Sequence, residues 1–257
     1  NILLEEDIFR TNPQALEKLN GWVKARDASR QPAAMYAMGS LLLEKDDLSG
    51  TVKMAEEGLS KYPQSLPVQI LSLNTITVLL DKNRLQDAER LISKYPGSSP
   101  DLVFQQGALA FLKKDYSLAQ KFFREAARRA SETTAENALF NENLAALNAN
   151  DASGAAALIK EASGSSRLRE SILFEQAHYA AKRMAPQAAE LLANFITLAE
   201  TPALKTQARL DQVEVALNLN PPDLETVQAI LPLLEKEQLS PEQTMQLARL
   251  NILEAES

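Results

Sequence analysis

The chain has 257 residues, of which 45% are hydrophobic and 24% charged, and its formal net charge is −7. This apolar content excludes a disordered chain. The sequence also has no run of about 18 apolar residues, the length that a helix needs to cross a membrane. The absence of cysteine excludes disulfides, thiolate metal sites and cysteine nucleophiles. Because the chain has a single histidine, a metal site with several histidine ligands is also excluded. An acidic pI of about 5.0 argues against nucleic acid as a partner.

The composition of the chain favours helices. Alanine and leucine dominate, followed by glutamate, glutamine, lysine and arginine, while glycine occurs 8 times and proline 12 times. Runs of β-branched residues that alternate with polar ones are absent. We therefore expect an all-α protein with almost no strand.

Helix starts and breakers predict the elements in chain order. Pro13 opens an N-terminal helix that reaches about Asp27, and Pro241 opens the final helix, as prolines near the first helical turn do. Six helix hairpins are expected between them: 32–45 with 50–62, 66–80 with 84–95, 99–113 with 117–130, 134–148 with 152–163, 167–183 with 186–199, and 202–217 with 222–236. We interpret residues 1–257 as one continuous stack, with N-terminal helices in 1–31, the hairpins in 32–236 and a C-terminal helix in 237–257.

An internal repeat supports the hairpins. The clearest unit runs from Val103 to Ala126 and has small or large apolar residues at Gly107, Ala119 and Phe123. Similar patterns recur at spacings of about 31 to 36 residues along the chain. A hairpin of this kind cannot bury its own apolar face, so stacking of neighbouring hairpins must provide the core.

This pattern resembles the tetratricopeptide repeat (TPR) family over roughly residues 32–236. The consensus of that family has small residues where the two helices of a hairpin cross and a proline after the second helix. Gly39, Gly107, Ala119, Ala126 and Pro63 stand at such positions. The resemblance implies a right-handed superhelical solenoid of antiparallel helix hairpins.

In TPR proteins the first helix of each hairpin lines a concave groove, so the resemblance implies a partner-binding surface. Its aromatic and amide side chains would suit an extended peptide or a helix. The candidate groove residues are Tyr36, Asn74, Phe104, Gln105, Ala108, Phe140, Asn141 and Phe174. For Phe104 and Phe140, a role in the core between helices is an equally good interpretation.

No catalytic, metal or cofactor site is predicted. His178 lies inside a predicted helix, no nucleophile motif accompanies it, and we interpret it as a partly exposed helical histidine. Neighbouring carboxylates such as Asp46 and Asp47 lack the calcium-loop pattern, and the Gly/Ser cluster at 163–166 lacks the lysine of a phosphate loop. Enzymatic activity through groove carboxylates has no supporting constellation.

The functional expectation is a non-enzymatic scaffold that binds another protein. Long periplasmic repeat arrays of this type resemble those of outer-membrane exporters of exopolysaccharide. A periplasmic piece of such a protein is therefore the first hypothesis, motivated by the absence of cysteine and by a start at Asn1 that indicates an excised or processed chain. A cytoplasmic TPR adaptor or peptide-binding regulator is the alternative.

Overall fold

The computed structural model describes residues 13–24 and 30–256. In this part of the chain all regular structure is helical, with fourteen α-helices, one 3₁₀ turn and no strand. The prediction of an all-α protein is confirmed.

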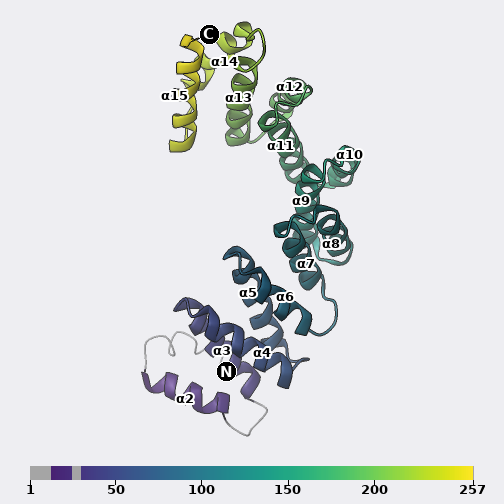
Figure 1. Ribbon diagram of the computed structural model, residues 1–257, viewed down its shortest axis with the longest axis vertical. Helices are drawn as coiled ribbons and strands as arrows, with labels where there is room; N and C mark the ends of the chain where they lie inside the picture. The colour runs from purple at the N-terminus through teal and green to yellow at the C-terminus, as the bar shows by residue number, and fades with distance from the viewer. Residues whose placement is uncertain (1–12, 25–29, 257) are drawn as a thin grey trace. The chain divides into compact units, whose positions relative to one another are not determined.

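Contacts divide the chain into two compact units, residues 1–138 and 139–257, and helix α9 spans the boundary between them. The first unit is drawn in colours from purple to teal in Figure 1. Its helices are α2 (Pro13–Lys24), α3 (Gln31–Glu44), α4 (Leu48–Lys61), α5 (Leu66–Asp81), α6 (Leu85–Lys94), α7 (Pro100–Leu112), α8 (Tyr116–Arg129) and the start of α9 (Glu132–Asn148).

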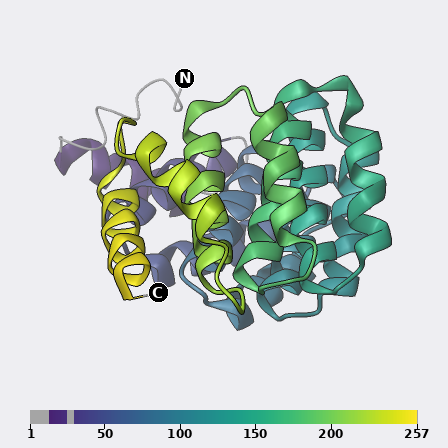
Figure 2. The same cartoon turned by 90° about the horizontal axis from the view of Figure 1, so that it is seen from above.

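The second unit also consists of helices joined by short turns, and several of these helices are seen side by side in Figure 2. After the end of α9, its helices are α10 (Ala152–Glu161), the 3₁₀ turn η2 (Ala162–Gly164), α11 (Ser166–Lys182), α12 (Ala188–Leu198), α13 (Pro202–Leu217), α14 (Leu224–Leu234) and α15 (Pro241–Glu256).

The predicted helices are confirmed. The ends of the six predicted helix pairs differ from the observed ones by about two residues at most. The N-terminal helix begins at Pro13 as predicted, and its predicted end at Asp27 lies outside the described residues. Whether the whole chain forms one continuous stack stays a prediction.

In each unit a central helix packs against the two helices before it and the two after it. In the first unit, α5 contacts α3, α4, α6 and α7, and in the second unit α13 contacts α11, α12, α14 and α15. The core therefore lies between successive helices, as expected for hairpins that bury each other's apolar faces.

Five hairpin turns share one backbone conformation. Each has a non-glycine residue with positive φ, between 49° and 64°, at Asp46, Asn83, Lys114, Asn150 and Met184. In each turn the following amide donates to a carbonyl five residues earlier at 2.8–2.9 Å, as from Asp47 to Leu42. This is the Schellman arrangement, which satisfies carbonyls at a helix end. Its recurrence at intervals of about 31 to 37 residues is structural evidence for the repeat.

Aspartate begins the second helix of four hairpins. Asp47, Asp115, Asp151 and Asp223 each accept a hydrogen bond from the amide three residues later, at 2.9–3.1 Å. Such N-caps satisfy amides that have no partner inside the helix. Together with the Schellman turn, they end one helix and start the next within about three residues.

Gly107 stands where α7 and α8 cross, as the repeat predicts. A Cβ atom at this position would lie 2.8 Å from Cδ1 and Cε1 of Phe123, closer than carbon atoms pack. Phe123 is 1% exposed, and its ring meets that of Phe104 edge-on with centroids 5.3 Å apart. The missing side chain of Gly107 thus makes room for the largest buried residue of this hairpin.

Gly39 has a different neighbour from the one expected. It was predicted to stand where α3 crosses α4 of its own hairpin. A Cβ atom there would instead lie 2.3 Å from Cδ1 of Leu71, on α5 of the next hairpin. The physical reason is that α3 packs against both α4 and α5, so a small residue on α3 can serve either contact.

Candidate functional site

The predicted groove residues of the first unit lie on α3, α5 and α7, which begin three successive hairpins. Tyr36 and Ala108 are half-buried and pack against the core of α4 to α7. Phe104 is half-buried against Phe123. These three side chains therefore contribute to packing as well as to the surface.

A polar link joins two of these helices. Nε2 of Gln105 on α7 donates to Oγ1 of Thr77 on α5 at 2.9 Å. Asn74 is exposed and precedes Thr77 by three residues, so both lie on one face of α5. Asn74, Thr77 and Gln105 together form the polar surface of the first unit that the groove hypothesis requires.

The predicted groove residues of the second unit are less accessible. Phe174 is only 8% exposed and packs against Phe195 with ring centroids 5.5 Å apart. Phe140 is half-buried against a cluster that includes Leu158. Asn141 is also half-buried.

A histidine–aspartate pair joins α11 to α13. Nδ1 of His178 lies 2.5 Å from Oδ2 of Asp211, whose side chain is fully buried, while that of His178 is 30% exposed. Gln207 donates to the other carboxylate oxygen at 3.2 Å, and Nζ of Lys182 lies 3.9 Å from it. The His178 ring stacks on Phe174, with centroids 5.5 Å apart.

These contacts change the acidity of the groups involved. The hydrogen bond to Asp211 raises the pKa of His178 above its ordinary value of 6.5, against the opposing effects of burial and of Lys182. Burial raises the pKa of Glu175 on the same helix, with His178 opposing and Asp211 adding to the change. The buried carboxylate of Asp211 thus favours the protonated form of the His178 imidazole.

Amide side chains extend this polar network to α15. Gln207 donates to Gln246 at 3.0 Å and accepts from Gln243 at 3.4 Å, while Gln246 donates to Glu214 at 3.3 Å. Lys182 completes the chain by an ion pair of 3.1 Å with Glu214. Helices α11, α13 and α15 are therefore joined by one network of polar side chains.

Sequence reasoning missed the role of His178, although a signal was present. His178 and Asp211 are 33 residues apart, and so are Gln176 and Asn143, and Arg183 and Asn150. A separation of one repeat places two residues at equivalent positions of neighbouring hairpins. Polar pairs at the repeat spacing were therefore candidates for contact.

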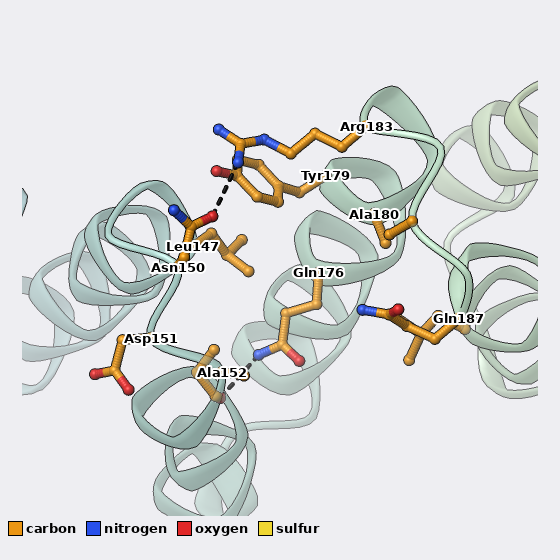
Figure 3. Close-up of a pocket in the computed structure, with 12 residues that line it drawn as sticks. Leu147, Asn150, Asp151, Ala152, Gln176, Tyr179, Ala180, Arg183 and Gln187 are labelled. Atoms are coloured by element: carbon orange, nitrogen blue, oxygen red, sulfur yellow. Dashed lines mark hydrogen bonds between the residues drawn. The ribbon is translucent and has the colours of Figure 1, made fainter.

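A cavity of about 330 Å³ lies among α9, α10, α11 and α12 in the second unit (Figure 3). Its floor is apolar and its polar groups come from the hairpin turns and from α11. The lining residues are Leu147, Asn150, Asp151, Ala152, Ala155, Gln176, Tyr179, Ala180, Arg183, Ala185, Gln187 and Leu191.

The described residues offer neither a metal site nor a membrane-spanning helix. No cluster of three or more histidine, aspartate or glutamate side chains has the arrangement of a metal site. None of the described helices combines the length and the apolar character that a membrane crossing requires.

Comparison with known proteins leaves the family open. No family model matches the chain, and no curated protein or solved structure matches it at a significant level. The functional argument therefore rests on the residues and their geometry.

Proposed function

We propose that this chain is a non-enzymatic scaffold of the TPR type that binds a partner protein along the first helices of its hairpins. The observation that carries the proposal is the repeated hairpin. Among the described residues one turn conformation occurs five times, and side chains one repeat apart contact each other. Repeats of this kind offer a long surface built from equivalent positions.

The hairpins are proposed to continue as a right-handed superhelix with a concave groove, as the resemblance implies. The contacts of α3 with α5, of α5 with α7, of α11 with α13 and of α13 with α15 support this arrangement. Stacking of that kind brings first helices to one side of a solenoid and second helices to the other.

The proposed docking surface combines the predicted residues with those found on the same helices. Asn74, Thr77 and Gln105 serve it in the first unit, and His178, Gln207 and Gln246 serve it in the second. Amide side chains suit a partner segment whose backbone groups need donors and acceptors. The half-buried rings of Phe104 and Phe140 are proposed to supply apolar contact at its edges.

The cellular setting is proposed to be the bacterial periplasm, within an envelope protein of exopolysaccharide export. The absence of cysteine supports a compartment that oxidises thiols. Fractionation of the source cells tests this location, and recovery of the protein from the cytoplasm would favour the adaptor alternative.

Affinity capture with paired variants tests the docking surface. Asn74→Arg places a bulky charge on α5, a first helix, and Gln86→Arg does the same on α6, a second helix; both positions are exposed. The immobilised parent chain is expected to retain a specific partner from source lysate. Asn74→Arg should lose this partner, while Gln86→Arg should keep it.

The comparison of the two variants decides the outcome. Equal retention by the parent and both variants would move the docking surface away from α5. Loss with Gln86→Arg alone would place it on the second helices and contradict the proposal.

A further inference from the structure

We propose that the cavity beside Arg183 binds a carboxylate next to an amide group and a short apolar side chain. An N-acylated amino acid and the C-terminal residue of a peptide both carry this chemistry. The inference goes beyond the scaffold role, because the cavity lies beside the turns of two neighbouring hairpins and uses none of the residues of the proposed docking surface.

Arg183 provides a fixed cation. Its guanidinium lies over the Tyr179 ring, 4.4 Å from the centroid, and its Nη1 donates to Oδ1 of Asn150 at 2.9 Å. In the described part of the chain no carboxylate lies within ion-pair distance of it. The guanidinium is thus held in place while its remaining N–H groups can donate to a ligand oxygen.

The hydroxyl of Tyr179 has an unmet requirement. Its oxygen is buried and has no hydrogen-bond partner among the described residues. Buried polar groups are nearly always paired, and an unpaired one is costly. Tyr179 and Arg183 line the same cavity, so a carboxylate bound there would supply the acceptor where it reaches the hydroxyl.

Helix α11 presents these groups on one face. Gln176, Tyr179, Ala180 and Arg183 follow the spacing of three, four and seven residues that lines one side of a helix. The cation and the Gln176 amide are therefore about 10 Å apart along the helix axis at their backbones, and both side chains reach into the space between.

Two amides can recognise a peptide group. Nε2 of Gln176 donates to Asn143 at 2.9 Å and to the carbonyl of Ala155 at 2.8 Å, so its oxygen remains as an acceptor. The Gln187 amide points toward Gln176 from the opposite side (Figure 3). An acceptor and a donor facing each other match the N–H and C=O of one amide group.

The rest of the cavity suits a small apolar group. Leu147, Ala155 and Leu191 line it, and its volume of about 330 Å³ is at the small end of ligand sites. Asp151 is the acidic residue of the lining, but its carboxylate caps α10 through Gly154 and points away from the other side chains in Figure 3. Repulsion of a bound carboxylate is therefore weak.

Binding of three probes to the 257-residue chain tests the proposal by amide chemical shifts in NMR. The probes are N-acetyl-leucine, its uncharged amide N-acetyl-leucinamide, and the peptide acid acetyl-Ala-Ala-Leu. We expect N-acetyl-leucine to bind with a Kd of about 1 mM or tighter. N-acetyl-leucinamide should bind at least about tenfold more weakly. Tighter binding of the peptide than of N-acetyl-leucine would identify the C-terminus of a chain as the natural ligand. Equal binding of these two acids would identify a free N-acylated amino acid.

Variants place the site. Arg183→Gln should weaken binding of N-acetyl-leucine about tenfold or more, and Tyr179→Phe should weaken it by a smaller factor. Arg167→Gln is the control, because it removes the same charge from the exposed start of α11, outside the cavity. Circular dichroism shows whether each variant is folded.

Three results would overturn the proposal. They are no binding of either acid, equal binding of acid and amide, and unchanged binding by Arg183→Gln. None of them affects the docking surface on α5, whose test uses different residues.

Discussion

Asp211 shows how this protein tolerates a buried charge. A carboxylate removed from water is costly unless it is paired and hydrogen-bonded. Here His178 and Gln207 are each hydrogen-bonded to one carboxylate oxygen of Asp211, and Nζ of Lys182 lies 3.9 Å from Oδ1. The group thereby ties α11 to α13.

Titration of His178 is expected to reflect this pairing. Its pKa should lie above 6.5, and Asp211→Asn should bring it down, because the charged acceptor is lost while burial remains. NMR can follow the imidazole without ambiguity, since the chain has a single histidine. Asp223→Asn, a change in a distant N-cap, is the control, and a pKa unaffected by Asp211→Asn would contradict the pairing.

The same pair predicts how stability depends on pH. A histidine whose pKa is raised in the folded state contributes stability that is fully present below the unfolded pKa, near 6.5. This stability is lost as the pH rises through the folded value. Urea midpoints of the parent should fall across that range, and those of His178→Gln should change less. Equal pH dependence of parent and variant would show that the pair adds no stability.

Gly107 is predicted to tolerate no side chain. Gly107→Leu places atoms into the Phe123 ring and should cost roughly 1–3 kcal/mol of unfolding free energy by overpacking. Gly21→Leu is the matched control, because a Cβ atom at Gly21 on α2 meets nothing within 4 Å. Urea unfolding measures both, and equal midpoints for Gly107→Leu and the parent would show that α7 and α8 are less closely packed.

The hairpin turns carry strain that glycine could relieve. Among the five non-glycine residues with positive φ in the described part of the chain, Asp46, Asn83 and Asn150 are of the types that adopt this conformation most readily. Lys114 and Met184 are not, because a longer side chain gains no local hydrogen bond there. The turn is therefore set by the helices around it as much as by its own residues.

Lys114→Gly is expected to stabilise the protein by about 0.5–1 kcal/mol, since relief of the β-carbon strain exceeds the added freedom of glycine when unfolded. Lys114 is exposed, so little other interaction is lost. Lys114→Ala keeps the β-carbon and should gain nothing, which makes it the control. Urea midpoints in which both variants behave alike would rule out strain at this turn.

Across the whole chain, the proposed solenoid makes a prediction about size. A compact domain of this length has a radius of gyration of about 18 Å. A stack in which each hairpin contacts only its neighbours extends with every repeat. Small-angle X-ray scattering should therefore give a clearly larger radius, and a value near 18 Å would contradict one continuous solenoid.

Much of the fold could be predicted from residue order. Prolines and aspartates mark helix starts, and a repeat of about 31 to 36 residues pairs the helices, because these signals act over a few neighbouring residues. Gly107 was correctly placed at a crossing for the same reason. Gly39 was not, since a helix that packs on two others offers no sequence signal for which of them comes closer.

The candidate sites were less accessible to sequence reasoning. His178 was interpreted as a partly exposed helical histidine, which its 30% exposed side chain on α11 confirms, but neither its pairing with Asp211 nor the cavity beside Arg183 was expected. Both depend on side chains 33 residues apart that meet only when hairpins stack. The sequence also could not predict that Phe174 is buried, and this burial decides whether its ring belongs to the core or to the groove.

Local chemistry along the chain therefore decides the helices, their turns and the all-α class. Contacts between hairpins decide which polar groups lose water and which find a partner. They bring Asp211 to His178, whose pKa its hydrogen bond raises, and they leave the buried hydroxyl of Tyr179 unpaired. The physical reason is range: helix propensity, capping and turn geometry act within a few residues, whereas burial depends on neighbours a full repeat away.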